Sequence, residues 1–371
     1  MLDRFDDFPL HQTPEPVRHL ASGDRNAYDR YFFNGYTADG EIFFALALGL
    51  YPNRRVMDAS FSVVRDGQQT ALHASRLAPD DRGELRVGPL SIEVIEPMRT
   101  LRIRVERNEH PIECDLLFRA RTSAIEEPRF QRRSAGRITM DSTRFTQFGS
   151  WEGSLRVAGK LIEMDPARVL GSRDRSWGVR SVGEREGGAP VGAPPQFFWL
   201  WAPLNFDTFC THFGVNEDAE GEPWHSNGCL VPLIGADDSP TDGEGIERMA
   251  EVRHEVRWQP GTRRAASARL SLVGRDRLER VIELSPILEF QMLGIGYLHG
   301  EWGHGLWKGE QALGFESWKL ADLDPLHAQH VHIQTLCKAR WGDQNGVGVL
   351  EQLVIGPHAP SGFRGMLDGA S

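Results

Sequence analysis

Short segments in which apolar and polar residues alternate run through the whole chain, and turn residues separate them. Clear examples are residues 90–97, LSIEVIEP, and residues 100–107, TLRIRVER. Alternation with a period of two is typical of β-strands that bury one face. Asp66-Gly67 lies between two more such segments and predicts a tight hairpin turn. Residues 42–51, IFFALALGLY, predict a buried strand.

The segments are many, short and evenly spaced, and no long amphipathic helix interrupts them. A parallel sheet of the α/β type needs helices between its strands. The pattern therefore predicts an all-β fold, built as an antiparallel sandwich or barrel with few short helices.

The second half of the chain repeats the style of the first. Residues 47–67 and residues 212–232 both contain an apolar strand, a glycine, a polar turn and a second strand. The sequence GSWEG around Trp151 has a counterpart, GLWKG, around Trp307. Both pairs are separated by close to half of the chain, which predicts a duplicated β module. Chance recurrence of glycine and tryptophan in a β-rich chain is the alternative.

The boundary between the two modules is expected in residues 185–196, REGGAPVGAPPQ. Glycine and proline at this density favour a linker or a long exposed loop. We therefore expect one module over residues 1–190 and a second over residues 191–371.

Composition and charge exclude several classes of protein. The formal net charge of -10 argues against a general nucleic-acid binder, which needs a basic surface. The four cysteines lack metal-ligand or CxxC spacing, which predicts reduced thiols in a cytoplasm-like compartment. The acidic N-terminus lacks the apolar region of a signal peptide, and the longest apolar run is about half of a membrane span. We expect a cytoplasmic protein without a membrane span.

Charge and aromatic surface are concentrated in residues 170–180, LGSRDRSWGVR. If this segment is a strand, Arg173 and Trp177 share one face and Asp174 lies on the other. A carboxyl group donates a proton near pH 7 only if desolvation raises its pKa, whereas neighbouring arginines lower the pKa. Asp174 is therefore either a catalytic acid or part of a structural network of arginine and aspartate.

A second concentration lies in residues 296–310, GYLHGEWGHGLWKGE, where glycines allow bends and close approach of the backbone. Acid–base chemistry by Glu301 or by a histidine is the favoured hypothesis. The H-x-E-x-x-H spacing of His299, Glu301 and His304 leaves a metal site as an alternative, although it differs from the helical HExxH motif. A glycine-rich turn with exposed histidines is the third interpretation.

Aromatic residues in residues 196–206, QFFWLWAPLNF, predict the wall of a cavity for an apolar ligand. His330 and His332 share a strand face further along the chain, but no third ligand has a defined spacing, so we expect structural or exposed histidines. The sequence contains no nucleophile elbow, P-loop or dinucleotide-binding fingerprint.

Several of these motifs resemble those of a known superfamily. GSRDRSWGVR is similar to the HDRxWG-type signature of the proteins that include carotenoid 1,2-hydratases (hydroxyneurosporene synthases), AttH-like proteins and fungal decalin-forming Diels–Alderases. GLYPN, GSWEG and GEWGHG resemble patterns of bacterial members. The resemblance covers about residues 49–356 and implies two tandem lipocalin-like modules. Because Arg173 replaces the histidine of the hydratases, only Asp174 and Trp177 correspond to their acid and aromatic residue.

The resemblance implies a lyase or isomerase, of hydratase or dehydratase type, that acts on an apolar isoprenoid-like or polycyclic substrate. Neutral Asp174 or Glu301 would protonate a carbon–carbon double bond, aromatic faces would stabilise the cation, and water would add. This chemistry requires no metal and no organic cofactor. His299 and His304 are further candidate catalytic groups, and the candidate substrate contacts are Arg173, Trp177, Trp199, Trp201, Tyr297 and Trp302.

The alternative function is that of a cytosolic binding protein for a lipid, a steroid or a terpenoid. Such a carrier uses the same cavity but needs no acid inside it. In either case the expected partners are an apolar small molecule and a second copy of the chain in a homodimer, without nucleic acid.

Overall fold

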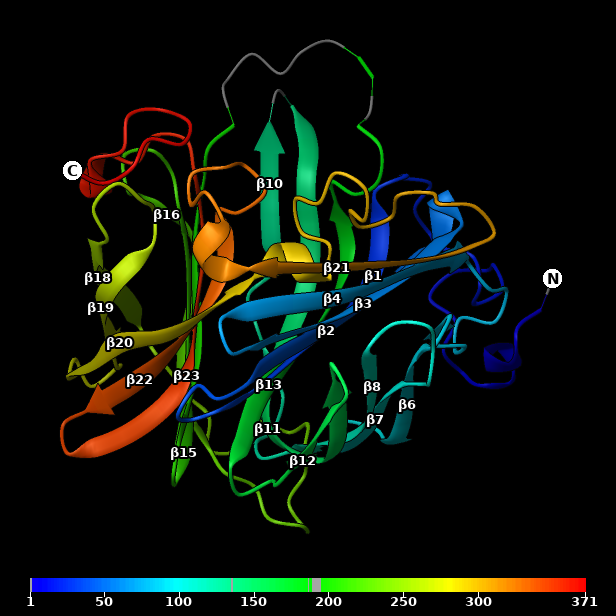
Figure 1. Cartoon of the computed structure of the whole chain (residues 1–371), viewed down its shortest axis with the longest axis horizontal. Helices are drawn as coiled ribbons and strands as arrows, with labels where there is room; N and C mark the ends of the chain where they lie inside the picture. Colours follow the sequence, from blue (N-terminus) through cyan, green and yellow to red (C-terminus); the bar gives the residue numbers. More distant parts are fainter. Residues whose placement is uncertain (1, 135, 186, 189–194) are drawn as a thin grey trace.

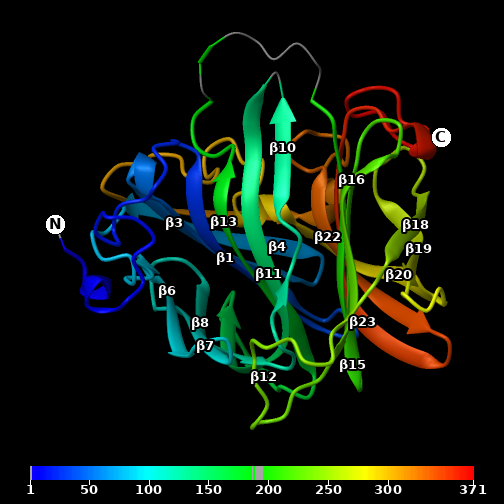
Figure 2. The ribbon, with the colours of Figure 1, turned by 180° about the vertical axis from the view of Figure 1, so that it is seen from behind.

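The computed structural model describes residues 2–134, 136–185, 187–188 and 195–371. Two curled antiparallel sheets lie side by side, as Figures 1 and 2 show from opposite directions. The predicted all-β fold is confirmed, because the described residues contain no α-helix. Their helical segments are five short 3₁₀ helices, η1 (Arg4–Asp7), η2 (Pro52–Arg54), η3 (Met292–Ile295), η4 (Leu320–Asp322) and η5 (Ala359–Ser361).

Fourteen strands form the first sheet. They are β1 (Ala27–Thr37), β2 (Phe43–Tyr51), β3 (Val56–Arg65), β4 (Gln68–Leu77), β5 (Arg86–Val87), β6 (Leu90–Glu96), β7 (Thr100–Val105), β8 (Ile112–Ala120), β9 (Ile125–Glu126), β10 (Phe130–Ser134), β11 (Arg137–Val157), β12 (Lys160–Met164), β13 (Val169–Arg180) and β21 (Gln311–Lys319). Their order is β21-β4-β3-β2-β1-β13-β11-β8-β7-β6-β5, and β9, β10 and β12 also pair with β11.

Nine strands form the second sheet. They are β14 (Phe197–Phe206), β15 (Phe209–Glu217), β16 (Pro223–Pro232), β17 (Glu247–Arg248), β18 (Glu251–Trp258), β19 (Ala265–Val273), β20 (Glu279–Gln291), β22 (His332–Trp341) and β23 (Gln344–Ile355). Their order is β17-β16-β15-β14-β23-β22-β20-β19-β18.

The two sheets share one topology. The path β3-β2-β1-β13-β11-β8-β7-β6 matches β16-β15-β14-β23-β22-β20-β19-β18 strand for strand in chain order. This match confirms the duplicated module, and Gly49 on β2 and Gly214 on β15 occupy corresponding strands. The predicted correspondence between GSWEG and GLWKG is wrong, because Trp151 lies on β11 whereas Trp307 lies in the loop before β21.

The boundary predicted at residues 190 and 191 lies outside the described residues. One strand connects the two predicted modules, since β21 comes from the second half of the chain and pairs with β4 in the first sheet. Figure 1 shows this strand along the edge of the first sheet. The two modules therefore correspond to the two repeated strand paths, and β21 from the second half of the chain extends the first sheet.

Local sequence explains the best-predicted elements. Asp66 and Gly67 join β3 to β4 with φ angles of 52° and 73°, the left-handed pair that a tight hairpin turn requires. All nine residues of β2 are buried. One face of β2, with Phe44 and Leu46, contributes to the core inside the first sheet, while Phe43 faces the second sheet. Burial of both faces explains the uninterrupted apolar sequence.

The described residues include no helix with the length and apolar character that are needed to cross a membrane.

Candidate active site

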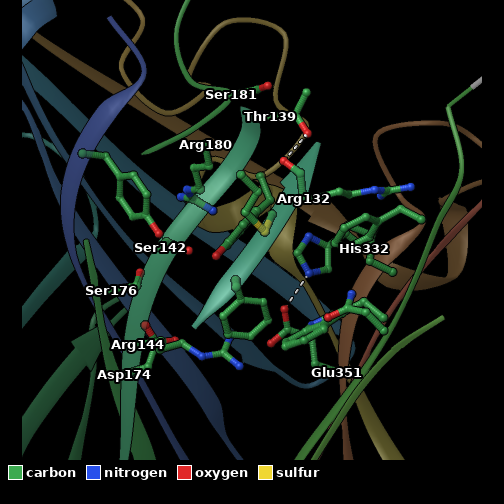
Figure 3. Close-up of a pocket in the computed structure, with 18 of the residues that line it drawn as sticks. Arg132, Thr139, Ser142, Arg144, Asp174, Ser176, Arg180, Ser181, His332 and Glu351 are labelled. Carbon is green, nitrogen blue, oxygen red and sulfur yellow. Dashed lines mark hydrogen bonds and ion pairs between the residues drawn. The ribbon is translucent and has the colours of Figure 1, made fainter. Parts of the chain in front are cut away.

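A cavity of about 390 Å³ lies between the two sheets (Figure 3). Strands β10, β11 and β13 of the first sheet form one wall, and β14, β15, β22 and β23 of the second sheet form the other. The lining combines aromatic rings with a small set of charged side chains. Such a mixture is typical of sites that bind an apolar ligand in one orientation.

Asp174 projects from β13 into the cavity, as Figure 3 shows. Ser176 follows Asp174 by two residues and lies on the same face of β13. It pairs directly with Arg30 on β1 and with Arg144 on β11. Asp174 is therefore a diagonal neighbour of both arginines, within reach of their charge. Burial raises the pKa of Asp174 to about 6, against the opposing effect of Arg144 and Arg30. Its carboxyl group is consequently partly neutral near neutral pH.

The arginines that flank Asp174 in the sequence do not pair with it. Arg173 lies on the opposite face of β13, where its Nε and Nη2 donate to Gln147 Oε1 at 2.9 and 2.7 Å. Arg175 forms an ion pair with Asp29. The flanking arginines therefore do not form a network with Asp174, because strand alternation turns their side chains away.

The raised pKa of Asp174 makes stability depend on pH. Because the folded pKa of about 6 exceeds the ordinary aspartate value of 3.8, folding takes up a proton between these values. Stability is therefore lost as the pH rises through this range. We expect Asp174→Asn to unfold at a higher temperature than the wild type at about pH 7.5, and at a similar temperature at about pH 4.

Differential scanning calorimetry at both pH values measures this difference. Glu301→Gln is the control, because Glu301 is exposed and its variant should change the melting temperature equally little at both pH values. A lower melting temperature of Asp174→Asn at about pH 7.5 would show that the charge of Asp174 stabilises the fold.

A histidine and a glutamate face Asp174 from the second sheet (Figure 3). His332 Nε2 lies 2.7 Å from Glu351 Oε1, and Gln334 Nε2 donates to Glu351 Oε2 at 2.8 Å. Burial alone would raise the pKa of Glu351, but the hydrogen bond and charge of His332, the hydrogen bond from Gln334 and the charge of Arg144 hold it below its ordinary value. Glu351 is therefore ionised. Its Oε1 accepts a hydrogen bond from the N–H group at His332 Nε2.

Whenever the His332 ring carries a single proton, this orientation places that proton on Nε2 and leaves a lone pair on Nδ1. The atom is buried, and no residue in the described part of the chain forms a hydrogen bond with it. Nδ1 can therefore accept a proton. The pair of His332 and Glu351 has the arrangement of a general base that a carboxylate orients.

Hydrogen bonds between the sheets hold the two walls together. Asn34 Nδ2 donates to Gln334 Oε1 at 3.0 Å, and Asn34 Oδ1 accepts from the backbone N–H of Ser172 at 2.7 Å. Gln334 contacts Glu351, and Ser172 precedes Asp174 by two residues on the same strand face. The chain of polar contacts therefore fixes the acid relative to the His332–Glu351 pair.

Arg144 forms a rigid part of the cavity wall. Its Nε donates to Glu127 Oε1 at 2.8 Å, and its guanidinium lies 4.8 Å from the ring centres of both Phe130 and Trp199. Trp199 lines the cavity as predicted from the sequence. Trp201 lies behind the lining, in the core between the sheets, 5.6 Å from the Arg144 guanidinium.

The glycine-rich loop contributes two of its predicted residues to this region. Tyr297 lines the cavity, and its ring centre lies 4.5 Å from those of His332 and His304. His304 Nε2 donates to the carbonyl of Ile295 at 2.9 Å, so its Nδ1 is an acceptor. Burial, Arg30 and Arg180 lower the pKa of His304 well below its ordinary value, which keeps this ring neutral.

Other residues from the sequence hypotheses lie away from the cavity. Glu301 is exposed in its loop. Trp177 is 42 % exposed, and Arg173 lies on the far face of β13. Of the two candidate acids, Asp174 is the one that faces the cavity.

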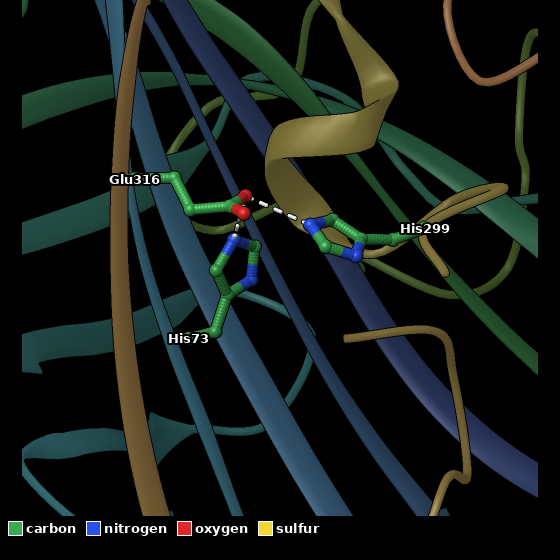
Figure 4. A group of neighbouring side chains, drawn as sticks. All are labelled: His73, His299 and Glu316. Atoms are coloured by element: carbon green, nitrogen blue, oxygen red, sulfur yellow. Dashed lines mark hydrogen bonds and ion pairs between the residues drawn. The ribbon is translucent and has the colours of Figure 1, made fainter. Parts of the chain in front are cut away.

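One group in the described part of the chain has the spacing of metal ligands: His73, His299 and Glu316 each offer an atom within 4.8 Å of the others (Figure 4). His299 Nδ1 accepts the backbone N–H groups of Glu301 and Trp302 at 3.0 and 2.9 Å. The proton of neutral His299 is therefore on Nε2, which donates to Glu316 Oε2 at 2.8 Å. This geometry fits a hydrogen-bonded contact between the loop and β21 better than a metal centre.

Sequence reasoning missed His332 and Glu351 as site residues. The sequence predicts a structural or exposed His332, and Glu351 is not among the predicted site residues. The available signal was a single carboxylate inside the apolar sequence GVGVLEQLVIG of β23, together with polar His332 and Gln334 on one face of β22. Buried polar groups on a strand need partners, and here the partners are each other.

Comparison with solved structures defines the class of fold. The chain is similar to kievitone hydratase from Nectria haematococca, with 14% identity, a TM-score of 0.52 and 88% of each chain covered. An AttH candidate from Nitrosomonas europaea has 14% identity and a TM-score of 0.53, over 93% of this chain and 98% of that chain. CghA with Sch210972 has 10% identity and a TM-score of 0.50, over 89% of each chain. The predicted resemblance to the AttH-like superfamily is thus confirmed for the fold.

The protein is therefore a tandem β-module protein with the fold of the AttH-like superfamily. A search of curated protein sequences gives no match. The model of a family of unknown function (DUF8625) matches residues 2–364, and the chain belongs to this family.

Proposed function

We propose that the protein is a lyase or isomerase, of hydratase or dehydratase type, that performs acid-initiated chemistry on an apolar isoprenoid-like or polycyclic substrate. One observation carries the proposal: Asp174, with a pKa raised to about 6, faces the His332–Glu351 pair across an aromatic cavity. An acid and a base on opposite walls suit the addition or removal of water across a carbon–carbon double bond.

In the hydration direction, neutral Asp174 gives its proton to one carbon of the double bond. The π electrons form the new C–H bond, and the other carbon becomes a cation near the faces of Trp199 and Tyr297. His332 Nδ1 takes a proton from water while the water oxygen bonds to the cation. Asp174 is then an anion and His332 a cation, and proton exchange with solvent restores both.

Kievitone hydratase shares the fold and is named for a hydration, which agrees with this proposal. The alternative is a binding protein for a lipid, steroid or terpenoid, which would use the same cavity without conversion. The His332–Glu351 pair favours the enzyme, because a simple carrier gains nothing from an unpartnered basic nitrogen beside its ligand.

The test is incubation of the protein with a panel of unsaturated and hydroxylated isoprenoids and polycyclic acids, followed by mass spectrometry. The expected product gains or loses the mass of one water molecule. Hydration in D₂O should place one deuterium on carbon, because Asp174 exchanges its proton with solvent. Ligand binding without any change in mass across the panel would support the carrier instead.

The pH dependence provides a second measurement on any substrate that is converted. If neutral Asp174 is the acid, kcat/KM should fall about tenfold per pH unit above about pH 6. A rate that stays constant between about pH 6 and pH 8 would contradict this role for Asp174.

A further inference from the structure

Two arginines, the buried Arg30 and the half-buried Arg180, converge on His304 at one end of the cavity. Arg30 Nη1 and Arg180 Nη2 each lie 3.4 Å from Nδ1 of the neutral His304 ring. Arg30 is only 2% exposed, and its Nε and Nη2 have no hydrogen-bond partner in the part of the chain that the structure describes. One imidazole nitrogen accepts about one hydrogen bond, whereas two guanidinium groups offer about ten N–H donors. In the described part of the chain, Nε and Nη2 of Arg30 and Nε of Arg180 are buried donors without a hydrogen-bond partner.

No carboxylate of the described residues lies within 4.0 Å of either guanidinium to form an ion pair. The buried carboxylate that influences both arginines, Asp58, already accepts from the Tyr51 hydroxyl at 3.2 Å and the Gly305 N–H at 2.6 Å. The buried Arg30 and the half-buried Arg180 thus form a pair of adjacent positive charges, and neither has a carboxylate of the described residues in direct contact. Buried charge of one sign is unfavourable unless a counter-charge approaches it.

The cavity provides the route for such a counter-charge. Arg180 lines the cavity, together with the hydroxyl groups of Ser142, Ser176 and Ser181. The guanidinium of Arg180 lies 4.7 Å from the ring centre of Tyr28, which limits its movement. A planar guanidinium with unused donors is suited to bind a carboxylate through two parallel hydrogen bonds.

We propose that the Arg180 end of the cavity binds a carboxylate, with the positive charge of Arg30 behind it. The substrate class is then a hydrophobic carboxylic acid, with its apolar body against Trp199 and Phe197. The assignment as a substrate rests on the proposed function, whereas the anion site itself does not. A bound carboxylate beside Asp174 would also favour the neutral form of that acid.

The test compares naphthaleneacetate with its uncharged amide, naphthaleneacetamide, by isothermal titration calorimetry at about pH 7.5, where the acid is ionised. We expect the carboxylate to bind the wild type at least about tenfold more tightly than the amide. This preference should disappear in Arg180→Gln. It should remain in Arg132→Gln, because the guanidinium of Arg132 donates to the carbonyl of Gln196.

Asp174→Asn separates this proposal from the proposed function, since this variant should keep the preference for the carboxylate even if it has no turnover. Equal affinity for the two probes in the wild type, or a preserved preference in Arg180→Gln, would overturn the anion site. If Arg180→Gln does not fold, Arg180→Lys keeps the charge without the planar fork. The Arg180→Lys variant should prefer the carboxylate over the amide less strongly than the wild type does. An unchanged preference would also contradict the role of Arg180.

Discussion

Asp174→Asn is expected to lower turnover by about a thousandfold while the protein stays folded. Asparagine preserves the shape of the side chain but has no proton of suitable acidity to give to carbon. Asp174 is the acid on the first-sheet wall of the cavity, and burial raises its pKa to about 6. The measurement is kcat on a converted substrate, with circular dichroism to verify the fold.

Asp141→Asn is the matched control for this variant. Asp141 lies on the neighbouring strand β11 and pairs with the exposed Arg129, outside the cavity lining. Its amide variant and Glu301→Gln should both retain turnover within about twofold of the wild type. Full activity of Asp174→Asn would exclude acid catalysis by this residue and would favour binding or catalysis by shape alone.

Glu127→Gln is expected to lower the free energy of unfolding by about 3–5 kcal/mol. The Glu127 side chain is fully buried, and it pairs with Arg144 through two hydrogen bonds. Burial alone would raise the pKa of Glu127, but Arg144 and His212 hold it far below its ordinary value, so the pair is ionic. Removal of the negative charge leaves the Arg144 guanidinium buried between Phe130 and Trp199 without its hydrogen-bonded counter-ion.

Urea denaturation at about pH 7 measures this loss. Glu251→Gln is the control, because the pair of Glu251 and Arg253 is exposed, and its loss should change the free energy by less than about 1 kcal/mol. The double variant Glu127→Gln/Arg144→Met removes both charges and should recover part of the stability. A Glu127→Gln protein as stable as the wild type would mean that water or another group already compensates Arg144.

Strand patterns could be predicted because they depend on neighbours in the chain. The hairpin at Asp66 and Gly67 follows from local backbone preferences, and the buried strand β2 follows from its apolar sequence. Of the two predicted repeats, the one through Gly49 and Gly214 is correct because it compares strand with strand. The predicted repeat through Trp151 and Trp307 is wrong, because the glycine-rich loop around Trp307 has a composition similar to that of the strand around Trp151.

The candidate site was only partly predictable. Alternation predicts that Asp174 lies on the opposite face of its strand from Arg173 and Trp177, and of the aromatic candidates Trp199 and Tyr297 line the cavity. The histidine spacing around Glu301 suggested a common site, but the loop directs His299 toward Glu316 and His304 toward two arginines. A spacing without regular secondary structure does not determine where side chains point.

The sequence by itself determined the β class, the duplication and the face on which Asp174 lies, because alternation along one strand is a local property. Only the tertiary structure decided which groups share the cavity with Asp174. Strand β13 of the first sheet faces β22 and β23 of the second, and this packing brings His332 and Glu351 to the opposite wall. The same packing removes water from Asp174, and this burial, rather than the neighbouring arginines in the sequence, decides its pKa.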